Sequence, residues 1–273
     1  MLELLEHISE GAYGKVDLVK RISDGRILIR KRPVKGFEKH IIDEGNLLHH
    51  LRNFNNSYCY PYVTCLEQIA FDSIDNIPYL LLGLNGLSYD KRKILSLAKL
   101  KLEIELGVHV KLRLADCIRL THQLLESILF IHAAGIAHTD LTDTNIIIQE
   151  ENTGYNLYVI DLGLACGLNV ECYRRSDTRE FINDTMGGLP TWEEWRNVPL
   201  ITAQQSDWFS VGMLLRIIWK NAYYEPLSWF KYQLIHYHLD EKYIASVSHD
   251  LNLWLRKNSQ RSSLRQLQDR LTI

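Results

Sequence analysis

The chain has 273 residues, of which 46% are hydrophobic and 23% are charged, and its formal net charge is −2. This length and apolar content suffice for a large core in one or two domains, and the near-neutral charge offers no general attraction to nucleic acid or a membrane surface. No apolar stretch reaches the roughly 20 residues that a membrane-spanning helix needs. We therefore expect neither a nucleic-acid partner nor a membrane partner.

The five cysteines are an odd number and include no Cys-x-x-Cys pair; they are Cys59, Cys65, Cys117, Cys166 and Cys172. This pattern argues against a disulfide framework and against structural zinc. The N-terminus lacks the basic start and apolar core of a secretion signal. We expect reduced thiols and an intracellular location, in the cytoplasm, the nucleus or both.

The first part of the chain has the turns and short apolar runs of an antiparallel sheet. Residues 8–16, Ile-Ser-Glu-Gly-Ala-Tyr-Gly-Lys-Val, indicate a strand, a glycine turn and a second strand. Such a turn lets backbone N–H groups approach a phosphate, although an ordinary β-hairpin fits the same residues. Asp24-Gly25 predicts a hairpin turn before a third strand at 26–32.

Alternate residues of the third strand share a face, so Ile29 and Lys31 point together. Arg30 and Arg32 are expected to point the other way, toward solvent. Further strands are predicted at 60–71 and 77–82.

The first predicted helix covers residues 37–51, where apolar residues recur at helical spacing and Glu44 lies between them. Residues 91–113 are a helical stretch whose basic side chains fit a solvated face or a docking patch. Residues 114–134 are the clearest helix, with Gly135 as its C-terminal cap. A buried helix is predicted at 206–215.

Two short motifs carry the chemistry. The first is His138-Thr139-Asp140-Leu141-Thr142-Asp143-Thr144-Asn145, which precedes an apolar strand, and the second is Ile160-Asp161-Leu162-Gly163, which ends another. A turn between the strands would bring Asp140, Asn145 and Asp161 together. Oxygen-bearing side chains suit Mg²⁺, and Asp140 could accept a proton from an attacking hydroxyl. This combination favours phosphoryl transfer.

His-x-Asp-x-x-x-x-Asn followed by Asp-Leu-Gly resembles the catalytic loop and metal-binding turn of the protein kinase superfamily. The resemblance runs from residue 8 to about residue 267. It implies an α+β, two-lobed protein kinase-like fold. Residues 1–84 would form an N-lobe with an antiparallel β-sheet and one main helix, and residues 85–273 a mainly α-helical C-lobe.

The resemblance also implies roles for individual residues. Asp140 would accept the proton, and Lys31 would bind phosphates while paired with Glu44; Asp43 fits the family's spacing less well. Asn145 and Asp161 would hold Mg²⁺, with Mn²⁺ as a possible substitute. ATP would be bound by a larger set: Ser9, Gly11, Gly14, Val16, Ile29, Lys31, Leu82, Gly83 and Leu84. In this set Ser9 takes the place of the usual first glycine, and Leu82 to Leu84 form the hinge.

The chain departs from the family pattern in the catalytic loop. Thr142 stands where Ser/Thr kinases carry a lysine, as in kinases of large DNA viruses and in the small kinase of the tRNA-threonylcarbamoylation complex. Ser206-Asp207-Trp208 favours the viral group. Thr139 stands where regulated kinases carry an arginine that binds an activation-segment phosphate. We therefore expect activity that does not depend on such phosphorylation.

The activation segment lacks the family's Ala-Pro-Glu anchor. Glu193 or Glu194 is expected to replace it and to pair with Arg261.

The resulting expectation is a kinase that transfers the γ-phosphate of Mg·ATP to Ser/Thr hydroxyls of protein substrates. Two alternatives stay open: a non-catalytic pseudokinase that serves as an interaction module, and a small-molecule phosphotransferase of the aminoglycoside or choline kinase type. The sequence does not indicate an oligomeric state.

Overall fold

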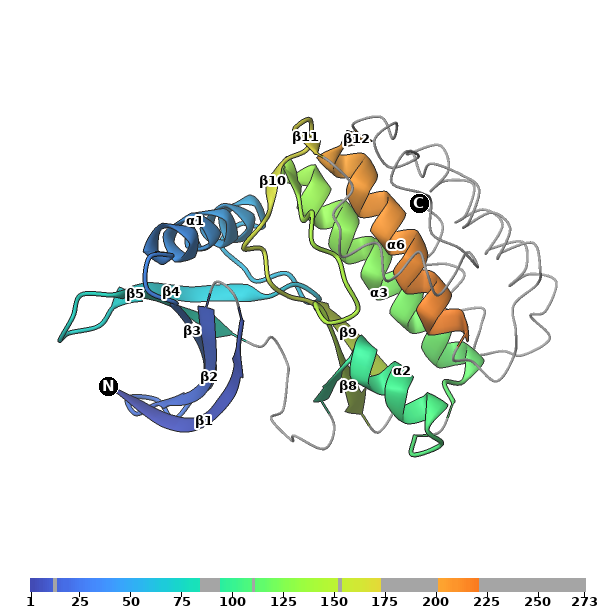
Figure 1. Ribbon diagram of the computed structural model, residues 1–273, viewed down its shortest axis with the longest axis horizontal. Helices are drawn as coiled ribbons and strands as arrows, with labels where there is room; N and C mark the ends of the chain where they lie inside the picture. The colour runs from blue at the N-terminus through green and yellow to red at the C-terminus, as the bar shows by residue number, and fades with distance from the viewer. Residues whose placement is uncertain (12–13, 84–93, 110, 152–153, 173–200, 221–273) are drawn as a thin grey trace.

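The computed structural model describes residues 1–11, 14–83, 94–109, 111–151, 154–172 and 201–220 (Figure 1). A β-rich part comes first in the chain and a helical part follows, so the predicted two-lobed α+β fold is confirmed. Several predicted features lie outside the described residues: the hinge residue Leu84 and the expected anchor residues Glu193, Glu194 and Arg261.

The N-terminal sheet has five antiparallel strands in the order β1-β2-β3-β5-β4. Their bounds are β1 Leu2–Glu10, β2 Gly14–Arg21, β3 Ile27–Pro33, β4 Cys65–Phe71 and β5 Pro78–Gly83. The strand predicted at 60–71 begins only at Cys65. The preceding residues bond instead to the second part of the chain, where Thr64 N donates to Val159 O and Val159 N donates to Tyr62 O, both at 2.9 Å.

Helix α1, Glu38–Phe54, lies against this sheet (Figure 1). Its apolar positions Ile41, Leu48 and Leu51 are buried, as the helical spacing predicts. At Gly45 an added Cβ would lie 2.8 Å from side-chain atoms of both Ile69 and Leu80. Glycine at this position therefore lets α1, which carries Glu44, pack closely against strands β4 and β5.

The second part combines helices with short strands. Its elements are β6 Ile94–Ser96, α2 Leu97–Glu105, α3 Leu114–Ala133, β7 Ile136–Ala137, β8 Ile146–Glu151, β9 Gly154–Val159, β10 Cys166–Gly167, β11 Glu171–Cys172, β12 Ile201–Thr202 and α6 Ala203–Lys220. The continuous helix predicted over 91–113 is wrong in its described portion. Residues 94–96 pair with β8, and the Ser96 side chain then accepts from Lys99 N to start α2.

Helices α3 and α6 run side by side and form the centre of the second part (Figure 1). Leu124 and Ile128 of α3 and Leu214 and Ile218 of α6 are fully buried. One continuous hydrophobic core joins these helices to the inner face of the sheet. Because a single core spans both parts, residues far apart in the sequence are held at fixed positions relative to one another. None of the described helices is long and apolar enough to cross a bilayer.

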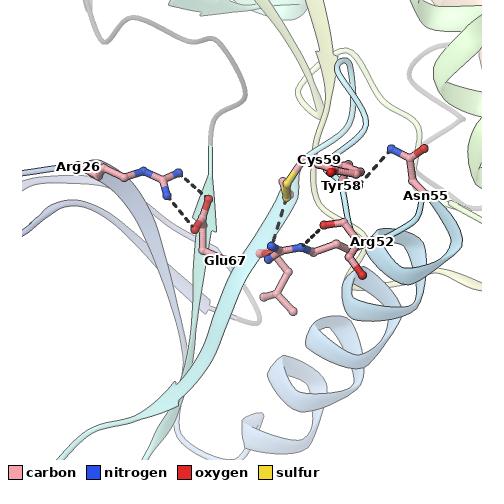
Figure 2. Close-up of a disulfide and its surroundings, with 9 residues drawn as sticks. Arg26, Arg52, Asn55, Tyr58, Cys59 and Glu67 are labelled. Carbon is pink, nitrogen blue, oxygen red and sulfur yellow. Dashed lines mark hydrogen bonds and ion pairs between the residues drawn. A yellow bond between two sulfur atoms is a disulfide. The ribbon is translucent and has the colours of Figure 1, made fainter. Parts of the chain in front are cut away.

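Cys59 and Cys65 form a disulfide between the middle of the α1–β4 connection and the first residue of β4 (Figure 2). The expectation of five reduced thiols is therefore wrong for this pair. A cysteine count does not reveal that the chain turns back here and brings the two Cα atoms to 5.5 Å. Arg52, beside the disulfide, spans the same turn by donating to Ser57 O and Leu66 O. Cys117 is a buried thiol, and burial raises its pKa to about 12.

Candidate active site

The backbone of the catalytic-loop motif is bound by Asp207, a buried residue of α6. Its carboxylate accepts from the backbone N–H groups of His138 and Thr139, each at 2.7 Å, and contacts His132 Nε2 of α3 at 2.9 Å. Three hydrogen bonds to one buried carboxylate fix the loop's backbone between two core helices. His132, a buried histidine near the end of α3, is thus a partner of Asp207.

Asp140 and Asn145 are joined directly within that loop. Asn145 Nδ2 donates to Asp140 O at 2.9 Å and to Asp140 Oδ2 at 3.1 Å. Ile160 N donates to Asn145 O at 3.0 Å and links the loop to the second motif. His138 Nε2 donates to Ile160 O at 3.0 Å, and its Nδ1 accepts from Asp140 N at 3.3 Å. The two motifs therefore meet, as the turn between their strands predicts.

Asp161 faces a lysine from the N-terminal sheet. Lys31 Nζ lies 2.8 Å from Asp161 Oδ1 and 2.8 Å from Glu44 Oε2. Asp161 adopts a left-handed backbone, φ 64°, and its Oδ1 also accepts from Gly163 N at 3.1 Å. Asp43, the rival of Glu44 in the sequence, is exposed and pairs with Lys39. Glu44 is the acid that α1 presents to the face of the sheet that carries Lys31.

The charges of this cluster influence one another. Burial alone would lower the pKa of Lys31, but Glu44 and Asp161 outweigh it and hold that pKa above its usual value. Burial would raise the pKa of Asp161, yet Lys31 brings it below the usual range. Glu44 is more deeply buried, and burial raises its pKa. Lys31 is therefore a permanent cation close to Asp161.

Four predicted nucleotide-binding side chains lie on one face of the sheet. Val16 is opposite Lys31 on β2 and β3, and Ile29 is opposite Leu82 on β3 and β5. Since directly opposed residues share a face, and since Ile29 and Lys31 are two residues apart, all four face the side on which Glu44 and Asp161 lie.

The glycine turn joins β1 to β2 next to these side chains. Gly11 N donates to Gly14 O at 2.8 Å, and Ser9 lies opposite Val16 in the register. A Cβ at Gly14 would lie 2.7 Å from Arg32 O, so the close approach of β2 and β3 requires glycine there. Gly83 is the last residue of β5 and is buried against Glu67.

The sequence matches the protein kinase domain family over residues 2–269. The chain belongs to the protein kinase family. Among its relatives, this kinase chain is 27% identical to mitogen-activated protein kinase 13 of Bos taurus over 173 residues, 61% of the chain and 41% of the relative. It is 29% identical to mitogen-activated protein kinase 12 of Danio rerio over 167 residues, which are 59% of the chain and 40% of the relative. A probable cell division protein kinase of Encephalitozoon cuniculi is 26% identical over 166 residues, which are 58% of the chain and 45% of the relative.

The kinase chain thus spans less than half the length of the curated relatives it matches. A solved structure, the kinase domain of BubR1, superposes with a TM-score of 0.57, covering 80% of this chain and 61% of that one. Its sequence identity is only 16%, so this likeness concerns the fold alone.

The donor set of this kinase fits a hard divalent cation. Asp161 contributes a carboxylate that is 42% exposed, and Asn145 an amide whose nitrogen is already bonded to Asp140. Among the described residues, no three His, Cys, Asp or Glu side chains gather into a metal site. Mg²⁺ is usually held by only one or two protein carboxylates, which leaves coordination positions for phosphate oxygens and water.

Sequence reasoning missed a second charged cluster on the opposite face of the sheet. Asp17, a buried residue of β2, accepts a hydrogen bond from Arg30 at 3.0 Å, forms an ion pair with Arg32 at 3.0 Å and contacts His7 at 3.0 Å. Arg30 and Arg32 lie on the face away from Lys31, as predicted, but both pair with the buried Asp17 carboxylate. The Arg30 side chain is only 16% exposed, so the expectation of a solvated side chain is wrong for Arg30, whereas the Arg32 side chain is 38% exposed. In the sequence Asp17 stands between Val16 and Leu18, but only the structure gives the register that places it opposite Arg30.

Proposed function

We propose that this chain is an active protein kinase that transfers the γ-phosphate of Mg·ATP to Ser or Thr hydroxyls of protein substrates. The observation that carries the proposal is one connected cluster of five residues from both parts of the chain. Lys31 bonds to Glu44 and Asp161, Asn145 bonds to Asp140, and the Ile160 N–H joins the two halves through Asn145 O. A binding module would not need all five side chains joined in one hydrogen-bonded network.

In this proposal Asp140 accepts the proton of the substrate hydroxyl as its oxygen attacks the γ-phosphorus, and ADP leaves with the electron pair of the broken P–O bond. Lys31, held by Glu44 and Asp161, binds phosphate oxygens. Asn145 and Asp161 hold the cation. Mg²⁺, or Mn²⁺ in its place, supplies positive charge to the phosphates when bound.

The nucleotide base would lie under the glycine turn, between Val16 and Ile29 above and the hinge that starts at Leu82 and Gly83. We propose that residues 1–84 form the nucleotide-binding lobe and residues 85–273 the catalytic lobe. Their single core keeps Lys31 and Asp161 at a fixed separation. An ATP-dependent reaction favours the cytoplasm or the nucleus as the place of action.

Thr142 stands in the place of the family's catalytic-loop lysine. Its Oγ1 lies 2.7 Å from Thr144 Oγ1, and the two hydroxyls form a neutral pair. We propose that Lys31 and the bound cation supply the positive charge near the transferring phosphate.

The function is tested by incubating the purified chain with Mg·ATP and a mixture of proteins and small-molecule acceptors, with Asp140→Asn as the control. Mass spectrometry should find new phosphoserine or phosphothreonine that depends on Asp140. Phosphorylation of small molecules alone would identify a small-molecule phosphotransferase instead. The absence of any phosphorylated product, together with intact ATP binding, would indicate an interaction module.

We also propose that activity does not require a phosphorylated activation segment, since Thr139 carries no charge to bind a phosphate. Phosphatase treatment, checked by intact mass, should leave the initial rate unchanged. A drop of tenfold or more that is restored by rephosphorylation would contradict this.

A further inference from the structure

We infer that Thr139 is a positioning residue whose hydroxyl clamps the start of the activation segment onto the catalytic loop. Its effect on rate rests on the proposed kinase function, whereas the clamp itself does not. Thr139 Oγ1 donates to Leu164 O at 2.6 Å, a short hydrogen bond across 25 residues of sequence. The same residue's N–H donates to Asp207 Oδ1 at 2.7 Å. Thr139 thus connects α6 to the segment that follows the metal-binding turn.

The backbone of Thr139 indicates that these contacts matter. Its φ is +61°, in the left-handed region that β-branched residues rarely adopt. Glycine or asparagine would enter this conformation more easily. A threonine is held there by the two hydrogen bonds that its N–H and its hydroxyl donate.

The position of Leu164 explains what the clamp would control. His138 Nε2 donates to Ile160 O, and Thr139 Oγ1 donates to Leu164 O. Two adjacent catalytic-loop residues therefore grip the chain immediately before Asp161 and immediately after Gly163. The pairing continues outward, with Cys166 opposite Ala137 and Gly167 opposite Ile136.

Asp161 is thus held between two side-chain contacts from the loop that carries Asp140. Without the hydroxyl, the turn would keep its contact at Ile160 and lose the one at Leu164. Asp161 and the first residues of the activation segment would then leave their positions more often. The hydroxyl uses a carbonyl of the chain itself, so no added phosphate is needed to order this part of the segment.

The test compares Thr139→Val, which keeps the shape and loses the hydroxyl, with Thr139→Ser, which keeps the hydroxyl. We expect Thr139→Val to lower kcat about threefold to tenfold, the range for loss of one net hydrogen bond. Thr139→Ser should lose less than about twofold on the same scale. Amide hydrogen exchange over residues 160–167 should be faster in Thr139→Val than in the other two proteins, while exchange in α3 and α6 should be the same in all three.

The outcomes separate the clamp from the function. Faster exchange over residues 160–167 in Thr139→Val, with wild-type exchange in Thr139→Ser, supports the clamp. This holds even if the wild type transfers no phosphate, in which case only the proposed function fails. Equal exchange and equal kcat in Thr139→Val and wild type would overturn the inference. So would equal losses in the Val and Ser variants, because the methyl group or the backbone would then be responsible.

Discussion

Strand β3 carries two charged clusters on its opposite faces. On one face Lys31 pairs with Glu44 and Asp161, and on the opposite face Arg30 and Arg32 pair with Asp17. Each cluster contains a nearly buried carboxylate: the Glu44 and Asp17 side chains are both 2% exposed. Burial and opposite charge therefore do not distinguish the two.

The clusters differ in where their partners come from. The partners of Asp17 come from neighbouring strands of one sheet, so among the described residues its network joins β1, β2 and β3. Lys31 bonds across 130 residues to Asp161, whose side chain is still 42% exposed. We interpret the first cluster as a structural tie and the second as a site, because only the second offers a solvent-accessible acid assembled from distant segments. Substitutions in and around the two clusters would sharpen or break this distinction.

The largest effect is expected for Asp140→Asn, in the loop that joins the Lys31 cluster through Asn145 and Ile160. The amide cannot accept the hydroxyl proton, so turnover should fall about 10²- to 10⁴-fold while the fold and ATP affinity persist. Peptide phosphorylation and a thermal-shift titration with ATP measure the two properties separately. Undiminished phosphorylation by the variant would remove Asp140 from the mechanism.

Asp161→Ala should weaken Mg²⁺-dependent nucleotide binding about 10- to 100-fold, because a charged ligand of the cation is lost. Asn145→Ala should act in the same direction. Titration of ATP with and without Mg²⁺ provides the test, and Asp17→Asn serves as a control that removes an acid from the other face. An equal Mg²⁺-dependent affinity in wild type and Asp161→Ala would argue against the ligand assignment.

Asp17→Asn should lower the free energy of unfolding by about 1–3 kcal/mol, since it leaves charged donors without their acceptor. Turnover should be unaffected. Burial alone would raise the pKa of Asp17, but the bonds from His7 and Arg30 and the charge of Arg32 outweigh it and bring that pKa below its usual value.

This depressed pKa sets the pH dependence. The carboxylate's contribution is complete above its ordinary pKa of 3.8 and is lost as the pH falls through the lower value of the folded state. Urea unfolding should therefore show a constant difference between wild type and Asp17→Asn near neutral pH and a shrinking one in acid. A difference that grows in acid would show that Asp17 is not the responsible group.

The smallest effect is expected for Asp43→Asn, the matched control for Glu44. Asp43 makes an exposed pair with Lys39 one helical turn away, worth less than about 0.5 kcal/mol. Its loss should not change turnover. Glu44→Gln, by contrast, should lower turnover about tenfold or more because Lys31 loses a charged partner. Equal kinetics in the two variants would cancel the distinction between a site acid and a surface acid on α1.

Much of the fold was predictable because its signals are local. The helix at 114–134, the hairpin turn at Asp24-Gly25 and the shared face of Ile29 and Lys31 follow from periodicities of a few residues. The spacing from Asp140 to Asn145 is equally local, and the structure does join those two side chains. The start of β4 was placed too early, because residues 60–64 look like a strand by composition but bond to Val159 on a distant segment.

The sequence by itself determined the protein kinase family, the two-part α+β architecture and the short motifs that carry Asp140, Asn145 and Asp161, since each depends on residues close together in the chain. Only the tertiary structure decided which partners those motifs have. It paired Arg30 and Arg32 with Asp17, brought Cys59 next to Cys65, and placed the Leu164 carbonyl within hydrogen-bond distance of the Thr139 hydroxyl. The physical reason is that hydrogen bonds and ion pairs act over about 3 Å in space. Which atoms come that close is set by how one core closes around both parts of the chain.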